Sequence, residues 1–352
     1  MAYTTIDDPS VYFQTAIYAG NGSTQSITND GNSDLQPDWI WFANRTNAPR
    51  DRIIIDSTRG VDLSLYSNQT KGDQSLTDVM SSFNSDGFSL ESNVRANESS
   101  QNHVAWQWKA NGGTTASNSD GSITSTVQAN TTAGFSIVTY TGTGSTATVG
   151  HGLGAKPDVY IVKNREEEQD WMGYFNGTAS DPETDGLRLN TTDAITDASS
   201  FWNDTAPTSS VFTVNTSTNV NKSSIDYIAY CFTSIQGYSK FGGYTGTGSE
   251  DGPFVYLGFK PQWILFKNTG AAEEWVLQDT TRNPNNPVTK NIRVDSSIAE
   301  ADASSIDIDF LSNGFKNRSD QAQINSSGVT YIYMAFAEHP FVSSKGAPVT
   351  AK

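Results

Sequence analysis

The chain carries one sequence pattern three times, and this repetition constrains its fold more than any other feature. A proline precedes an apolar run at Pro37, Pro157 and Pro261, which lie 120 and then 104 positions apart. Further markers keep the same order and nearly the same spacing. They are the tyrosines before Gly-x-Gly-Ser (Tyr18, Tyr140, Tyr244), a phenylalanine after a turn (Phe88, Phe212, Phe315) and a closing apolar run (104–108, 228–232, 332–336). Because short solenoid repeats span about 20–50 residues, a period near 104 predicts whole domains copied in tandem.

Each copy has the sequence signature of β-structure. Segments of four to eight residues rich in Val, Ile, Tyr, Phe, Trp and Thr alternate with clusters of Gly, Asn, Asp and Ser, as in Phe135–Tyr140 and Tyr227–Phe232. Only 76–83 and 297–304 are weak candidates for a helical turn. About seven short strands in roughly 100 residues predict an all-β chain of three tandem antiparallel β-sandwich domains, of jelly-roll or immunoglobulin-like type.

The markers also divide the chain. We expect an N-terminal arm, a first sandwich, a Ser/Thr/Gly-rich linker, two further sandwiches and a C-terminal tail. Their boundaries are 1–10, 11–113, 114–133, 134–237, 238–341 and 342–352.

The strand after each proline is apolar on both faces, as in Trp39-Ile40-Trp41-Phe42. Successive side chains of a strand point to opposite faces, so such a strand must be covered on both sides. One face belongs to the core of its own sandwich. The other needs a loop, a neighbouring copy or another subunit, which favours a homo-oligomer or a multi-copy assembly.

Composition excludes some classes of partner. Lys and Arg number 22 against 38 Asp and Glu, a net charge of −16 that nucleic acid and anionic membranes would repel. Apolar runs are too short to insert into a membrane, and the first residues do not resemble a signal peptide, so we expect synthesis in the cytoplasm. Cys231, the only cysteine, lies in an apolar run and is expected to be a buried thiol.

Enzymatic chemistry has little support in the sequence. The three histidines, His103, His151 and His339, fall at different places of the repeat, and no Cys/His spacing suits zinc. Glu166–Glu168 is interpreted as a solvated loop. Asp307 and Asp309 share one strand face, where calcium binding is an alternative to a solvent-facing edge. We therefore predict no catalytic residue, no cofactor and no metal site, with bound calcium left open.

Exposed aromatic residues are the remaining candidates for ligand contact. Trp171 and Trp275 are equivalent in two copies, which favours a structural role. Trp202 has no counterpart in the other copies. With the polar residues Asn203 and Asp204 beside it, it is a candidate for contact with a ligand or host surface.

Taken together, the repeated Tyr-Thr-Gly-x-Gly-Ser, Pro-Asp and Asn-Gly-Phe motifs and the opening Met-Ala-Tyr-Thr-Thr-Ile resemble structural proteins of marine tailed bacteriophages. The resemblance spans Met1 to about Phe341. Such proteins are described as virion or tail-fibre components, so the resemblance implies a place in the particle.

From this resemblance we expect a non-enzymatic virion protein in a tail fibre or another appendage that contacts the receptor. A capsid decoration, cement or head-fibre protein is the alternative, and a carbohydrate-active depolymerase is the third. The expected partners are other virion proteins of the capsid or tail and a host surface glycan. Attachment is expected through the N-terminal segment, which can add a strand to a partner's sheet. Its apolar anchors are Tyr3, Ile6, Val11, Tyr12 and Phe13.

Overall fold

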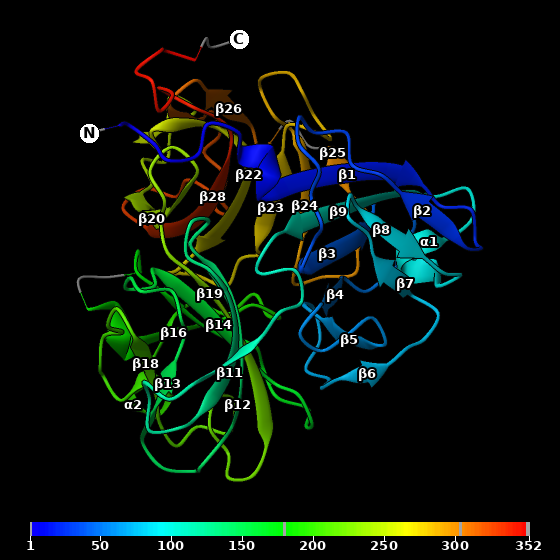
Figure 1. The fold of residues 1–352 in the computed structure, drawn as a ribbon. Coiled ribbons are helices and arrows are strands. Elements are labelled where there is room, and N and C mark those ends of the chain that lie inside the picture. The colour runs from blue at the N-terminus through cyan, green and yellow to red at the C-terminus, as the bar shows by residue number, and fades with distance from the viewer. Residues whose placement is uncertain (1, 179–180, 303–304, 350–352) are drawn as a thin grey trace.

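The computed structural model describes residues 2–178, 181–302 and 305–349 and shows an all-β chain built from antiparallel sheets (Figure 1). This confirms the all-β, antiparallel part of the predicted fold class. Helical structure in the described residues is limited to α1 (Val94–Asn97), α2 (Ser199–Trp202) and two short 3-10 turns, η1 (Pro9–Val11) and η2 (Pro182–Thr184). The candidate helical turn at 76–83 is wrong, because Met80–Phe83 forms a strand; residues 303–304 of the other candidate, 297–304, lie outside the described residues.

The first segment (residues 11–113) forms one large and one small sheet. The large sheet has the order β1-β9-β3-β4-β5-β6, and the small sheet has the order β2-β8-β7. The strands are β1 (Phe13–Ala19), β2 (Gln25–Ile27), β3 (Trp39–Asn44), β4 (Ile53–Asp56), β5 (Leu63–Tyr66), β6 (Gln74–Ser75), β7 (Met80–Phe83), β8 (Phe88–Leu90) and β9 (Asn102–Trp108).

The second segment (134–237) contains the large-sheet run β12-β19-β14-β15-β16-β17 and the small pair β13-β18. Its strands are β12 (Phe135–Thr141), β13 (Ala147–Gly150), β14 (Val159–Asn164), β15 (Met172–Phe175), β16 (Asp185–Arg188), β17 (Thr196–Asp197), β18 (Val211–Val214) and β19 (Asp226–Phe232). The expected linker, 114–133, is not merely a connecting loop. It forms β10 (Ala116–Asn118) and β11 (Ser125–Asn130), which extend this sheet beyond β12.

The third segment (238–341) has the large sheet β20-β28-β22-β23-β24-β25 and the small sheet β21-β27-β26. Its strands are β20 (Ser239–Thr245), β21 (Phe254–Tyr256), β22 (Phe259–Asn268), β23 (Val276–Asp279), β24 (Lys290–Arg293), β25 (Ala301–Asp302), β26 (Ile308–Leu311), β27 (Gly314–Asn317) and β28 (Thr330–Pro340). In all three large sheets the first and last long strands of the segment pair side by side, and the strand after the proline marker flanks them.

Each segment has an apolar core of its own between its two sheets. Phe88, Phe212 and Phe315, the phenylalanines of the third sequence marker, are fully buried in these three separate clusters. Cys231 is also fully buried in the cluster of the second segment, as expected for a structural thiol.

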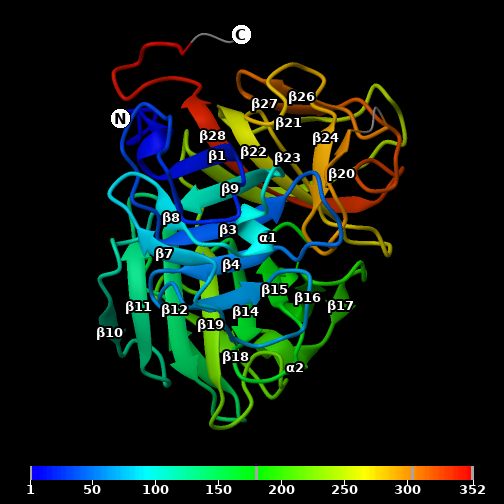
Figure 2. The ribbon, with the colours of Figure 1, turned by 90° about the vertical axis from the view of Figure 1, so that its right-hand side faces the viewer.

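A fourth cluster joins all three segments in the middle of the molecule. It contains aromatic side chains from each large sheet, including Trp39, Trp108, Phe232, Trp263 and Phe336. Alternate residues of β3 explain the geometry, because Ile40 and Phe42 point into the local core while Trp39 and Trp41 point into the shared one. Both faces of this strand are therefore covered, and the neighbouring segments cover the second. The three lobes meet around this cluster (Figures 1 and 2).

The Gly-x-Gly-Ser marker follows the first strand of each segment and packs against the loop before the last. A Cβ atom on Gly20, Gly142 or Gly246 would lie 2.2–2.3 Å from a backbone oxygen of that loop, so only glycine fits. An asparagine of the same loop then donates its side-chain Nδ2 to the carbonyl of the marker serine. These pairs are Asn97 with Ser23, Asn221 with Ser145 and Asn325 with Ser249, at 2.6, 2.6 and 2.7 Å.

Neighbouring segments are joined by hydrogen bonds at corresponding positions. The indole of Trp171 donates to the carbonyl of Tyr66 at 2.8 Å, and that of Trp275 donates to the carbonyl of Arg188 at 2.9 Å. At the third junction the Arg52 side chain takes this place and donates to the carbonyl of Arg293 at 3.2 Å. The first segment thus contacts the second, the second the third, and the third the first, so the three form a closed ring.

Candidate functional site

The N-terminal segment is bound to its own chain. The Tyr3 hydroxyl donates to the carbonyl of Gly258 at 2.7 Å, and the Thr4 hydroxyl donates to the carbonyl of Gln236 at 2.8 Å. Ile6 and Phe13 are buried in the central cluster. The expectation of an N-terminal arm that is free to bind a partner is therefore wrong: these residues link the start of the chain to Gln236 of the second segment and Gly258 of the third.

The other arm residues take part in the same packing. Val11 ends the turn η1 and is partly buried, and Tyr12 contacts the Tyr238 ring edge-on at a centroid distance of 6.0 Å. Phe13 stacks on Phe336 at 5.2 Å. Tyr3 is the anchor closest to the surface, since its hydroxyl also lies 3.2 Å from that of Tyr256 in an exposed pair.

Trp202 is fully buried, contrary to the expectation that it faces a ligand. Its indole donates to the carbonyl of Asp185 at 2.8 Å, and its ring meets Tyr160 edge-on at 4.8 Å. The neighbouring Asn203 and Asp204 are exposed and have positive φ angles of 56° and 47°. They form the turn after α2, so the structure separates this pair from the tryptophan.

The three histidines lie on different parts of the chain: His103 is on β9, His151 follows β13 and His339 is on β28. No group of three or more His, Cys, Asp or Glu side chains in the described part of the chain could hold a metal ion. His103 is buried, and desolvation lowers its pKa to about 4 although the nearby backbone of Glu98 and Arg95 favours the protonated ring. It stacks on Tyr18 at 5.4 Å, just as Tyr227 stacks on Tyr140, so it takes a structural position.

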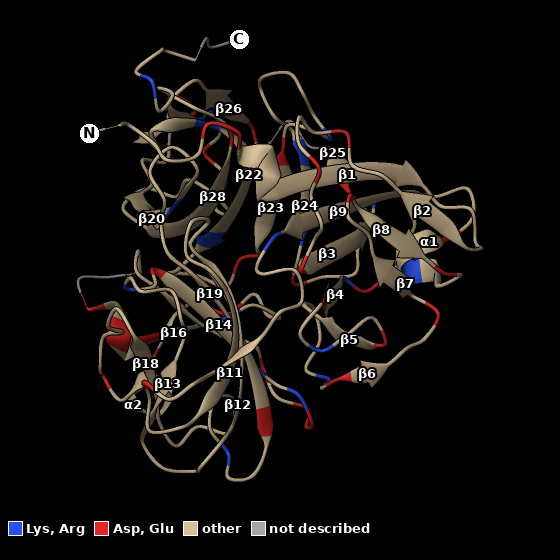
Figure 3. Ribbon diagram, viewed as in Figure 1, with Lys and Arg blue, Asp and Glu red and all other residues tan. Residues whose placement is uncertain are grey.

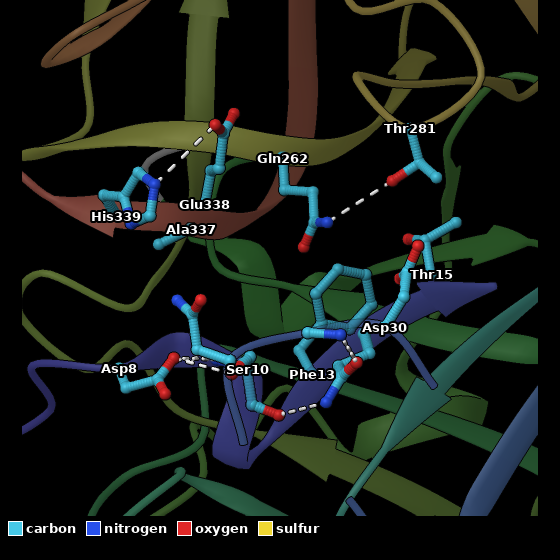
Figure 4. Close-up of a pocket in the computed structure, with 13 residues that line it drawn as sticks. Asp8, Ser10, Phe13, Thr15, Asp30, Gln262, Thr281, Ala337, Glu338 and His339 are labelled. Atoms are coloured by element: carbon cyan, nitrogen blue, oxygen red, sulfur yellow. Dashed lines mark hydrogen bonds and ion pairs between the residues drawn. The ribbon is translucent and has the colours of Figure 1, made fainter. Parts of the chain in front are cut away.

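A polar cavity of about 250 Å³ lies where the third segment meets the first (Figure 4). Thr15 of β1 lines it from one side and Gln262, Thr281 and His339 from the other. The Thr15 hydroxyl is buried and lacks a hydrogen-bond partner. At the corresponding place between the first and second segments, Gln128 of β11 donates to the Thr58 hydroxyl at 2.8 Å. The cavity thus lies at a place that β11 occupies in the junction between the first and second segments.

A second hollow, of about 360 Å³, lies beside the N-terminal segment and β21. We call it the aromatic hollow and define it by Tyr3, Gln236, Lys240 and Tyr256. Tyr256 and Phe254, two residues apart on β21, are 48% and 47% exposed. The Lys240 ammonium donates to the carbonyl of Tyr256 at 2.6 Å and lies 5.5 Å from the centre of its ring.

Sequence reasoning placed ligand contact at Trp202 and missed the aromatic hollow. A signal was present, because the strands equivalent to β21 have no aromatic residue at the positions of Phe254 and Tyr256. Val255 pairs with Phe315 just as Ile27 pairs with Phe88 and Val149 with Phe212. Phe254 therefore corresponds to Ser26 and Thr148, and Tyr256 corresponds to Thr28 and Gly150. A comparison of copies strand by strand would have found this difference.

Residues 8–340 match a family described as a domain of unknown function, DUF7483, so the chain belongs to this family. No curated protein and no solved structure matches the chain. Among the described residues, no helix is long and apolar enough to cross a membrane. Acidic and basic residues are scattered over all three lobes (Figure 3).

Proposed function

We propose that this protein is a non-enzymatic structural component of a bacteriophage virion, placed on the outside of the particle in a tail fibre or another appendage that contacts the host. The resemblance of its repeated motifs to virion proteins of marine tailed phages is the starting point. Its location would then be the virion, and its partners would be capsid or tail proteins.

We further propose that residues 11–113, 134–237 and 238–341 are three copies of one β-sandwich that act as a trimer within a single chain. The common strand order of their large sheets and the corresponding cross-segment hydrogen bonds support this. Symmetric oligomers usually place equivalent surfaces around an axis. Here one chain supplies three similar surfaces.

The observation that carries the proposal is the closed ring around the shared aromatic cluster. The repeated motifs serve this ring: the glycines fit the loops, the phenylalanines fill the local cores, and the tryptophans join the segments. A rigid body of this kind suits a surface component of a particle, whose task is to hold position. Capsid decoration is the alternative role, and it would use the same rigidity.

Cryo-electron microscopy of purified phage particles tests the proposal, with mass spectrometry to count copies. Density for the three-lobed ring at a few tail positions is the expected result. Hundreds of copies over the head would instead support decoration. Absence of the protein from purified particles would refute the virion role.

A further inference from the structure

The aromatic hollow differs from the rest of the surface in the kind of side chain that it exposes. Phe254 and Tyr256 are the aromatic members of the five large hydrophobic side chains that are exposed in the described residues. Because successive residues of a strand alternate between faces, these two rings project from the same face of β21. Tyr256 lines the hollow together with the partly buried Tyr3, and Phe254 lies two residues before Tyr256 on the same face of the strand.

The fold does not require these rings. Val255, between them, faces the local core, as do its counterparts Ile27 and Val149 in the other segments. The positions on either side are Ser26 and Thr28 in the first segment, both exposed, and Thr148 and Gly150 in the second, where residues 114–133 cover this face of the strand. The same strand therefore forms without aromatic residues at these positions, and exposing large apolar side chains to water has no benefit for folding.

The charge of the hollow is opposite to that of the chain. The net charge of the protein is −16, yet no carboxylate lines the aromatic hollow. The adjoining hollow, which shares Tyr3 and Gln236 with it, is lined by Lys345, and the nearest carboxylate there, Asp7, is already hydrogen-bonded to Ser344. Lys240 makes no ion pair among the described residues. An ammonium group has three donors, and the carbonyl of Tyr256 accepts only one of them.

We propose that the aromatic hollow binds a saccharide that carries a carboxylate. The apolar face of a sugar ring would stack on Tyr256, and Lys240 would donate its free hydrogen bonds to the sugar carboxylate. Polar groups of Gln236 and Ser239, which also line the hollow, are in place for the hydroxyl groups. This inference rests on the proposed function for its biological use, since acidic sugars would be met on a host surface.

Electrostatics favours an acidic over a neutral sugar at this place. Elsewhere the acidic surface repels anions, so an anionic ligand would be bound only where carboxylates are missing and a free ammonium group is present. The contribution of Lys240 should weaken with salt because the group is partly exposed. The contribution of the aromatic rings should not.

Isothermal titration of the purified full-length protein tests the inference. Oligogalacturonate and sialyllactose are the acidic probes, and the methyl ester of oligogalacturonate keeps the same rings without the charge. We expect the acid to bind more tightly than the ester. Tyr256→Ala should weaken binding of the acid about tenfold, as expected for the loss of one stacking contact. Lys240→Gln should remove the preference for the acid over the ester.

Ile17→Ala is the matched control, because Ile17 is 47% exposed and lies on β1, outside the hollow. It should bind both sugars like the unmodified protein. Failure of both acidic probes to bind, or equal binding by the Tyr256→Ala variant, would overturn the inference.

A parallel assay of particle incorporation separates this inference from the proposed function. If the protein is absent from particles but binds the acidic probes through Tyr256, the virion role fails and the sugar site stands. If Tyr256→Ala abolishes incorporation while leaving sugar binding unchanged, the hollow is a protein interface and the sugar site is refuted.

Discussion

The ring is closed by junctions of two kinds, although they occupy corresponding places. Between the third and first segments, buried Asp279 accepts hydrogen bonds from Arg282 and from the indole of Trp106, at 3.0 Å for the latter. Arg282 also binds Glu300, which in turn pairs with Arg45 of the first segment at 2.9 Å. The junction between the first and second segments repeats this network with other residues. They are Asp56, Arg59, Asp73, Arg165 and Tyr230.

The junction between the second and third segments has no corresponding ion pairs among the residues that the structure describes. By strand register, Phe175 stands where Asp56 and Asp279 stand, and Thr178 stands where the two arginines stand. Ile195 replaces the second carboxylate and packs against the central cluster. Its amide nevertheless donates to the carbonyl of Thr269 at 3.0 Å, just as that of Glu300 donates to Arg45 at 2.9 Å.

This difference shows that the backbone contact defines the junction and that the side chains can be ionic or apolar. Buried ion pairs gain little over apolar groups of similar volume, because removal of two charges from water offsets their attraction. Removal of only one partner of a buried ion pair lowers stability much more, since it leaves an unpaired buried charge. The ionic junctions should therefore be more sensitive to single substitutions than the apolar junction.

Arg282→Thr gives the largest expected effect. It leaves Asp279 and part of Glu300 without their cation in a buried place and should lower the free energy of unfolding by about 3–5 kcal/mol. Urea denaturation measures this loss. Thr178→Ala, at the corresponding place in the apolar junction, is the control and should cost only about 1 kcal/mol, the net contribution of the hydrogen bond from its hydroxyl to the carbonyl of Phe175. Equal losses for the two variants would contradict the comparison.

Asp279→Phe combined with Arg282→Thr copies the side chains of the apolar junction into the ionic one. Both charges leave together, so the double variant should recover most of the stability lost in Arg282→Thr. A residual loss of about 1–3 kcal/mol is expected, since the Trp106 indole then lacks its acceptor. Urea denaturation of the double and the single variant measures this difference in the free energy of unfolding. A double variant less stable than the single variant would show that the two junctions are not interchangeable.

Acid should loosen the ionic junction and spare the apolar one. Burial opposes ionisation of Glu300, but the hydrogen bonds and charges of Arg45 and Arg282 outweigh it and hold its pKa below the usual range. A carboxyl group with a lowered folded-state pKa contributes stability above its unfolded pKa, and this is lost as the pH falls through the folded value. We therefore expect local stability at this junction to fall as the pH drops below the usual pKa of a glutamate carboxyl group.

Hydrogen exchange at the two matched amides measures this effect. After correction for intrinsic rates, protection of the Glu300 amide should fall with acid more than that of the Ile195 amide. Glu300→Gln should abolish the difference. Parallel losses at both amides would mean that acid opens the whole ring at once.

Much of this arrangement follows from the sequence, and the parts that do not have physical causes. Alternation in runs such as Trp39–Phe42 predicts strands with two covered faces, and the structure confirms it. The alternation does not indicate which part of the protein covers the second face of these strands. The Ser/Thr-rich segment 114–133 has few apolar residues, yet β11 is held by its hydrogen-bonded register with β12, a backbone interaction that leaves little trace in side-chain chemistry.

The candidate site was harder to predict for a related reason. Trp202 is unique to its copy, but it fills space in the local core of the second segment, where the others have Val79 and Ile306. A residue can therefore be unique because a core is packed differently. Burial separates this case from Tyr256, which is also unique but exposed, and burial depends on contacts distant in sequence.

The smallest expected effect concerns buried lysines at two of the junctions. Lys163 donates to the carbonyl of Thr70 at 2.8 Å, and Lys267 donates to the carbonyl of Thr192 at 2.8 Å. Ala43 holds this position at the third junction. Desolvation lowers the pKa of Lys163 to about 7 and that of Lys267 to about 8.

Since both values lie below that of an unfolded lysine, the unfolded chain binds more protons, and stability should rise with pH from 7 to 9. We expect both lysines to contribute to this rise, and Lys163, whose pKa is lowered further, to contribute more than Lys267. Lys163→Met should remove its share of the slope of unfolding free energy against pH, measured by urea denaturation at pH 7, 8 and 9. Lys71→Met is the control, because Lys71 is exposed, and its slope should stay that of the unmodified protein. An unchanged slope in Lys163→Met would mean that Lys163 keeps its proton in the folded ring. The carbonyl oxygens around it would then stabilise the ammonium ion as strongly as hydration does in the unfolded chain.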